Sequence, residues 1–164
     1  MYTIREGKKE DLKYVFGLIK ELADFERAPE QVTNTLKNME NDGFGPNPVY
    51  WFYVVIKKGT KEIIGTAIYY YRYSTWKGKR LYLEDYIVTE TERGRGAGKL
   101  LFEKVMQKAI EENCTGMMWQ VLDWNDPAIN FYRKYNADIE SGWYNCHLQA
   151  KEIKTMLENK VIGE

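Results

Sequence analysis

Apolar residues recur at intervals of three and four positions in several stretches of this chain, a spacing that places them on one face of a helix. The clearest stretch begins at Leu12, and Pro29 closes it. A second stretch puts Val32, Leu36 and Met39 on one face and ends at an Asn-Asp-Gly turn. The pattern therefore predicts helices over residues 12–23, 32–40, 101–111, 127–135 and 151–159.

Runs of β-branched and aromatic residues predict strands between these helices. Residues 49–56 and 62–73 flank a Lys-Lys-Gly-Thr turn, which predicts a hairpin, and residues 80–89 supply a third strand. Shorter strands are predicted at 2–5 and 117–122, and closing strands at Ile139 and over residues 143–148. Strands and helices mixed in this order predict a three-layer α/β/α domain around a central mixed, mostly antiparallel sheet.

Length and charge narrow the range of functions. The 164 residues suit a single domain over 1–164, without repeat or linker. Lys and Arg total 24, as do Asp and Glu, so no net positive field attracts nucleic acid or an anionic membrane. No run of about 18 apolar residues and no secretory segment is visible, so we expect a cytoplasmic protein. Cys114 and Cys146 fit no metal spacing and are expected to be reduced thiols.

A basic, glycine-rich loop follows the strand that carries Glu84 and Asp85, and it opens a helix. Glycines let backbone amides approach a ligand, and the helix start adds unpaired N–H groups, so the loop predicts a polyphosphate site. A nucleoside triphosphate loop is excluded because Leu100 replaces the required hydroxyl after Lys99. The dinucleotide fingerprint also fails, because the position three after Gly96 is lysine. A glycine-rich turn with solvated arginines is the alternative.

The Arg-Gly-x-Gly-x-Gly pattern at 93–98 resembles the coenzyme A loop of the GNAT superfamily of N-acetyltransferases. Residues 122–132 resemble the superfamily's second signature, an asparagine at a strand-to-helix turn followed by a helix with a tyrosine. Stretches at 20–23, 25–26, 42–45, 73–78, 81–85 and 142–143 resemble the diamine acetyltransferase branch, which includes spermidine/spermine and thialysine N-acetyltransferases. The resemblance implies a GNAT-like fold, acetyl-CoA as co-substrate, no metal, a small cationic amine substrate and a homodimer.

The same resemblance assigns roles to individual residues. It implies Glu84 as the general base, acting through bound water, and Tyr132 as the general acid. It places substrate contacts at Phe25, Glu26, Glu84 and Asp85. A further contact is predicted at Glu140, one place before the position at which the branch commonly has an acid. Coenzyme contacts would come from Tyr86, Ile87, Val88, Arg93, Gly94, Arg95, Gly96, Ala97, Gly98, Lys99, Asn125, Asp126, Pro127, Ala128 and Tyr132.

Other roles for these residues stay open at this point. Glu84 could be a solvated strand-end carboxylate, and Tyr132 could belong to the core. Asp85 should face the opposite side of the sheet from Glu84 if the strand is regular, because side chains alternate. Ser141 stands where the branch commonly has an acid, which puts one polyamine contact in doubt. A protein or peptide acetyltransferase and a non-catalytic acyl-CoA sensor remain as alternative functions.

Overall fold

The computed structural model describes residues 1–158. The chain divides into two compact units, Met1–Gln120 and Val121–Glu164, and each is described by itself. None of the helices within residues 1–158 has the length and apolar character needed to cross a membrane. The sequence-based expectation of a single domain stays a prediction.

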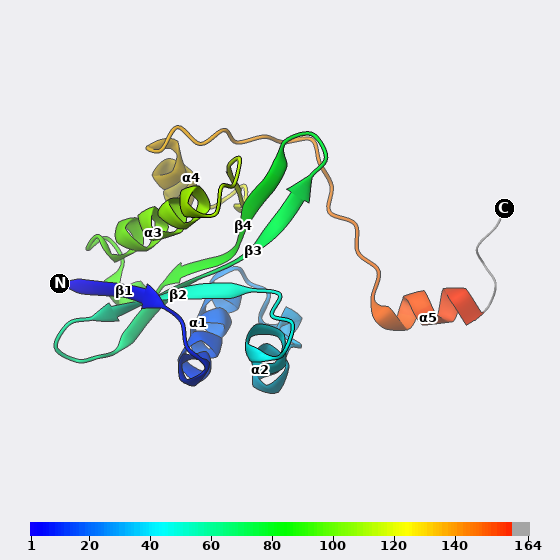
Figure 1. The fold of residues 1–164 in the computed structure, drawn as a ribbon, viewed down its shortest axis with the longest axis horizontal. Coiled ribbons are helices and arrows are strands. Elements are labelled where there is room, and N and C mark those ends of the chain that lie inside the picture. Colours follow the sequence, from blue (N-terminus) through cyan, green and yellow to red (C-terminus); the bar gives the residue numbers. More distant parts are fainter. Residues whose placement is uncertain (159–164) are drawn as a thin grey trace. The chain divides into compact units, whose positions relative to one another are not determined.

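The first unit contains a five-stranded sheet in the order β1-β2-β3-β4-β5 (Figure 1). The first three neighbouring pairs are antiparallel and β4 pairs with β5 in parallel, so the sheet is mixed and mostly antiparallel, as predicted. The strands are β1 (Tyr2–Glu6), β2 (Trp51–Lys57), β3 (Ile63–Ser74), β4 (Gly78–Val88) and β5 (Met117–Met118). The helices are α1 (Leu12–Phe25), α2 (Leu36–Phe44) and α3 (Ala97–Glu111), with short 3-10 turns η1 (Lys9–Asp11), η2 (Pro29–Gln31) and η3 (Glu90–Glu92).

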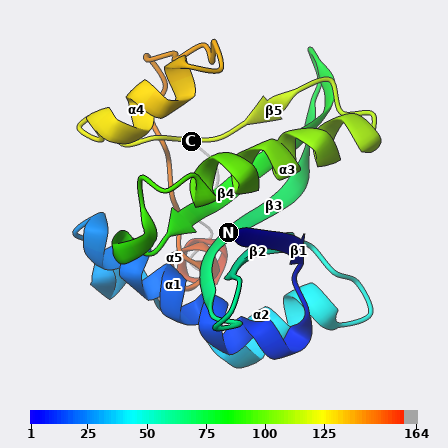
Figure 2. The same ribbon diagram turned by 90° about the vertical axis from the view of Figure 1, so that its left-hand side faces the viewer.

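Helices cover both faces of this sheet. Figure 2 shows α1 and α2 on one side of the strands and α3 on the other. The core under α1 and α2 is a cluster of buried apolar side chains: Leu12, Val15, Met39, Phe52, Val54 and Ile68. On the α3 side, Phe102 is buried and its ring centroid lies 5.8 Å from that of Tyr86 on β4. These layers confirm the predicted α/β/α architecture for this unit.

Most element boundaries in the first unit differ from the predictions by a few residues, and two of these differences have an identifiable cause. Helix α2 begins at Leu36 because the Thr35 hydroxyl accepts a hydrogen bond from the Asn38 N–H and caps the helix, which leaves Val32 outside. The strand predicted over 117–122 pairs with β4 only at Met117 and Met118. Local propensity therefore located both elements, whereas capping and pairing decided where they begin and end.

The second unit contains helices α4 (Asp126–Arg133) and α5 (Ala150–Glu158). The closing strands predicted at Ile139 and over 143–148 are wrong, since these residues form neither strand nor helix. A strand needs a partner for its N–H and C=O groups, and none of the strand pairings among residues 1–158 includes this stretch. Trp143 and Tyr144 are 84% and 95% exposed, so their apolar character is not used in packing. The predicted end of the last helix, Asn159, lies outside the described residues.

Candidate active site

The glycine loop between β4 and α3 has the backbone shape that the sequence predicted. Gly94 and Gly96 adopt left-handed conformations, with φ of +74° and +89°. A Cβ built on either residue would meet no atom within 4 Å, so the space beside the loop is open. Gly96 caps α3 without a side chain, and the first N–H groups of a helix have no partner inside it. The loop therefore presents unpaired amides in a geometry that fits a phosphate group.

A buried carboxylate, Glu92, connects this loop to the first two strands. Its side chain accepts a hydrogen bond from the Tyr2 hydroxyl at 3.0 Å and pairs with the Lys57 ammonium at 2.5 Å. The Arg95 guanidinium lies 3.8 Å from the same carboxylate. The hydrogen bonds from Lys57 and Tyr2 hold the pKa of Glu92 below its ordinary value. Glu92 is not recognisable as a site residue from the sequence, because its partner Tyr2 lies 90 positions away and no local pattern signals such pairing.

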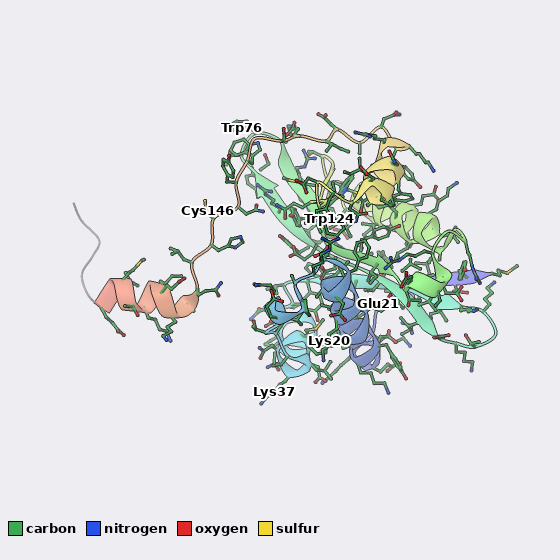
Figure 3. All side chains as sticks on the ribbon, turned by 180° about the vertical axis from the view of Figure 1, so that it is seen from behind. Lys20, Glu21, Lys37, Trp76, Trp124 and Cys146 are labelled. Atoms are coloured by element: carbon green, nitrogen blue, oxygen red, sulfur yellow. The ribbon has the colours of Figure 1, made fainter. Side chains whose placement is uncertain are left out.

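A second carboxylate, Glu21 on α1, anchors the other side of the loop (Figure 3). Glu21 accepts hydrogen bonds from the Thr89 hydroxyl and the Glu90 N–H, each at 2.9 Å, and lies 3.9 Å from the Arg93 guanidinium. The Arg93 Nε donates to the Val88 carbonyl at 2.8 Å. The guanidinium also lies over the Phe25 ring, 5.1 Å from its centroid. Among the predicted phosphate-binding cations, Arg93 is thus already engaged by protein groups.

Arg95 and Lys99 differ from Arg93 in this respect. Their side chains are 62% and 65% exposed, and each lies 3.8 Å from one carboxylate, that of Glu92 and Glu103 respectively. Ion pairs as long as 3.8 Å with an exposed cation cost little to exchange for a phosphate, and Glu92 keeps its shorter contacts with Lys57 and Tyr2. Arg95 and Lys99 are therefore better placed than Arg93 to form ion pairs with a polyphosphate.

Strand β4 contains a β-bulge at Glu84. Ile68 pairs with Asp85 and Tyr69 pairs with Leu83, so Glu84 has no partner of its own on β3. An extra residue interrupts the alternation of side chains along a strand. The prediction that Asp85 faces away from Glu84 held only for a regular strand, and it is wrong, because both residues line one cavity.

This cavity, which we call the acidic cavity, has a volume of about 200 Å³ and is lined by residues of α1, α2, β3 and β4 and of the segments flanking α2. Its apolar lining comes from Phe16, Ile19, Met39, Val49 and Ile68, and its carboxylates are Asp42, Glu84 and Asp85. Within residues 1–158, no lysine or arginine forms an ion pair with any of the three. The acidic cavity is therefore suited to a ligand that brings positive charge.

Two acids at this site, Asp85 and Glu26, have a raised pKa. Burial, reinforced by the negative charges of Glu84 and Glu26, raises the pKa of Asp85 to about 6. Burial also raises the pKa of Glu26, the residue that follows α1. Asp85 is thus a carboxyl that titrates close to neutral pH, and a general base works best with a pKa near the working pH. The structure brings the predicted site residues Glu26, Glu84 and Asp85 into one electrostatic group.

The second unit holds the other predicted site residues. Asn125 caps α4, with its side-chain oxygen accepting from the Ala128 N–H at 3.3 Å, and Pro127 occupies the first turn. Tyr132 is 5% exposed, and burial raises the pKa of its phenol to about 12. The phenol is therefore protonated at neutral pH and can donate a proton. Glu140 is exposed, in the stretch without regular structure.

No group of three or more His, Cys, Asp or Glu side chains within residues 1–158 could hold a metal ion. Both cysteines are free thiols, Cys114 buried and Cys146 exposed. Burial raises the pKa of the Cys114 thiol, which leaves it in the less nucleophilic protonated form.

Comparison with known proteins identifies the family. The sequence profile of the Acetyltransferase (GNAT) family matches residues 16–137. The chain belongs to the GNAT family. A thialysine N-epsilon-acetyltransferase from Bos taurus is 34% identical over 162 residues, which cover 93% of this chain and 95% of that protein. The spermidine/spermine N(1)-acetyltransferase-like protein 1 of Homo sapiens is 33% identical over 94% of this chain and 24% of its own length. This GNAT protein is therefore an acyltransferase.

Solved structures of GNAT acetyltransferases share the fold. An aminoglycoside acetyltransferase from an uncultured soil metagenomic sample superposes with a TM-score of 0.75 at 17% identity, covering 90% of this chain and 97% of that one. A possible acetyltransferase from Clostridium difficile 630 also gives 0.75, at 20% identity over 91% and 99% of the two chains. At such identities the likeness concerns the fold and leaves the substrate open.

Proposed function

We propose that this acetyltransferase uses acetyl-CoA and transfers the acetyl group directly to a primary amine of a small cationic substrate. Diamines, polyamines and thialysine-like amino acids form the candidate substrate class. The observation that carries the proposal is the acidic cavity, in which three carboxylates face no cationic partner. Two of them, Glu84 and Asp85, lie on β4, the strand that leads into the glycine loop. The names of the thialysine and spermidine/spermine relatives support the same class.

The glycine loop would bind the pyrophosphate of the coenzyme. The open backbone at Gly94 and Gly96 supplies room, and the start of α3 supplies N–H donors. Arg95 and Lys99 would add charge. The bound donor contributes an activated acetyl thioester, and a backbone N–H in the stretch 86–88 would stabilise negative charge on its oxygen during attack.

The acids of the cavity would prepare the amine. An alkyl amine with a pKa near 10.4 is neutral in about one molecule in two thousand at pH 7, so a proton must be removed before attack. Glu84 would accept it through water, or Asp85 directly. Asp85 is favoured by its pKa of about 6, which keeps it ionised at neutral pH and still basic enough to hold a proton.

Tyr132 would return a proton to the sulfur that leaves. Its buried phenol stays protonated, the form that this role needs. Since the amine can attack the thioester itself, the reaction needs no acyl-cysteine, in keeping with the protonated state of Cys114.

The size of the acidic cavity favours a small substrate over a peptide. Its volume of about 200 Å³ lies below the range of roughly 300–1,000 Å³ usual for drug-sized ligands. A peptide acetyltransferase needs an open groove along several residues of its substrate, whereas this site offers a short pocket. The predicted homodimer and cytoplasmic location remain predictions.

A panel of amines tests the proposal. The purified protein and acetyl-CoA are incubated with monoamines, diamines, polyamines, diamino acids and a lysine-containing peptide, and both free thiol and the acetylated product are measured. We expect thiol release with the small dications. Acetylation of the peptide alone would reject the small-amine class, and binding of acetyl-CoA without acetylation of any amine would indicate the sensor function instead.

A further inference from the structure

Carboxylates line the acidic cavity from two separate elements. Glu84 and Asp85 come from the bulge of β4, whereas Asp42 comes from α2. The charge interactions follow the same division: Glu84 and Glu26 act on Asp85, and Asp42 acts on Tyr50, whose pKa burial and this charge raise to about 12. The cavity thus has one acidic site on the strand and another on the helix.

Apolar side chains share the lining of the cavity with these two sites. Phe16 and Ile19 come from α1, Met39 from α2 and Ile68 from β3. Such walls suit a chain of methylene groups, because burial of each methylene is favourable by about 0.8 kcal/mol. A linear molecule with an ammonium group at each end and methylenes between them matches a lining that combines apolar walls with carboxylates from two different elements.

We propose that Asp42 binds the second ammonium group of a linear diamine whose first nitrogen lies at Glu84 and Asp85, which makes Asp42 a residue that determines specificity. This inference rests on the proposed function, since it concerns the same site and reaction. Asp42 is suited to the role because its carboxylate has no ion-pair partner within residues 1–158. Its backbone is held in place separately, by a hydrogen bond in which the Val49 N–H donates to the Asp42 carbonyl at 2.8 Å.

The same lining disfavours a substrate that carries a carboxylate. No lysine or arginine lines the acidic cavity. Arg72 does not line the cavity: its guanidinium donates to the Met118 sulfur on β5 at 3.0 Å, and its charge reaches Tyr70 of the cavity lining. An α-carboxylate would therefore enter a pocket of like charge without a partner. We infer that this enzyme prefers a simple diamine to a diamino acid of the same length, although relatives at about a third identity are named for thialysine.

The test uses the full chain and measures kcat/KM for 1,4-diaminobutane, 1-aminobutane and ornithine with acetyl-CoA. The variant is Asp42→Asn, and the matched control is Glu40→Gln, which removes a charge from the same helix at a residue that pairs with Lys9 at 3.0 Å and does not line the cavity. In the wild type we expect 1,4-diaminobutane to exceed ornithine by at least about tenfold. In Asp42→Asn the ratio of kcat/KM for diamine over monoamine should fall by about ten- to a hundredfold, mainly through KM.

Three results would overturn the inference: a diamine-to-monoamine ratio that Asp42→Asn leaves unchanged, an equal fall in Glu40→Gln, or ornithine outperforming the diamine in the wild type. In each case acetylation of small amines would still stand. If the wild type acetylates none of these amines, the proposed function itself fails. Thermal unfolding of Asp42→Asn with and without coenzyme A shows whether the variant is folded, and Asp42→Ser gives a second, smaller replacement for the same measurement.

Discussion

The glycine loop and the acidic cavity of the first unit both contain carboxylates, but those beside the loop form ion pairs and those in the cavity form none with the described residues. Glu92 and Glu21 beside the glycine loop are satisfied by hydrogen bonds from Lys57, Tyr2 and Thr89. Asp85 and its neighbours in the acidic cavity have no cationic partner within residues 1–158. The pKa of Glu92 is accordingly lowered, and the pKa of Asp85 is raised to about 6.

We propose that this difference separates carboxylates that shape the protein from carboxylates that bind a ligand. A paired acid stabilises its ionised form and fixes the segments it connects, as Glu92 does for β1, β2 and the loop. An unpaired acid in a cavity costs folding free energy, and such groups cluster at functional sites. The comparison predicts that changes in the cavity affect catalysis most, whereas changes beside the loop affect coenzyme binding and stability.

Loss of the cavity acid should have the largest effect. Asp85→Asn removes the carboxylate that titrates near neutral pH, so we expect kcat/KM to fall by about 10²–10⁴-fold. In the wild type, activity should decline as the pH drops through about 6, where Asp85 becomes protonated. A pH profile of kcat/KM for wild type, Asp85→Asn and Glu84→Gln checks this, with Asp24→Asn as an exposed acidic control on α1. If the decline of kcat/KM near pH 6 persists in Asp85→Asn and disappears in Glu84→Gln, the general base is Glu84.

Tyr132 tests whether a buried group without charge can also be catalytic. Tyr132→Phe keeps the ring and removes only the hydroxyl, so turnover should fall by roughly ten- to a thousandfold while the Kd for coenzyme A changes little. Steady-state kinetics and calorimetry measure the two quantities. Phe131, whose ring centroid lies 5.5 Å from that of Tyr132, offers the packing control Phe131→Leu. Unchanged turnover in Tyr132→Phe would assign the residue to packing.

Substitutions in the glycine loop should change the affinity for coenzyme A more than they change turnover. Gly96→Glu places a negative side chain in the open space beside the loop, whereas Gly96→Ala imposes a similar backbone penalty at φ +89° without the charge. We expect the Kd for coenzyme A to rise about tenfold or more in Gly96→Glu relative to Gly96→Ala, with the gap narrowing at high salt. Calorimetry of the two variants gives the comparison. Equal affinities would remove the loop from phosphate binding.

The sequence predicted most of the helices and strands and most of the candidate site residues. The main features that it did not predict depend on pairing between segments far apart in the chain. The helix ahead of Pro29, the central hairpin and the glycine-capped α3 follow from local periodicity and turn residues. The bulge at Glu84 depends on how β3 pairs with β4, and the Glu92 network joins residues 35 and 90 positions apart. The closing strands at 143–148 failed because apolar alternation does not supply a partner strand. Local signals located the candidate residues, and only the tertiary pairing showed which charges are satisfied.

The smallest expected effect is on the stability of the fold, but it gives the most direct comparison. Replacing Glu92 beside the loop and replacing Asp85 in the cavity should change the stability at pH 7 in opposite directions. For Glu92 the folded pKa is lowered, so its contribution is present above the unfolded value near 4.3 and is lost as the pH falls through the folded pKa. Glu92→Gln should therefore lower the melting temperature at pH 7, with a smaller loss in acid. The control Glu103→Gln, an exposed acid on α3, should change it little.

For Asp85 the folded pKa is raised, so the folded state binds the extra proton and this group's stabilising contribution is present below the unfolded pKa near 3.9 and is lost as the pH rises to about 6. Asp85→Asn should then stabilise the protein at pH 7 by at most about 3 kcal/mol, a gain that disappears toward pH 4. Thermal unfolding of both variants between pH 4 and 8 measures the two signs together. If Asp85→Asn also destabilises the protein at pH 7, the carboxylate of Asp85 is holding the fold together, and the distinction between structural and ligand-binding acids does not apply to this cavity.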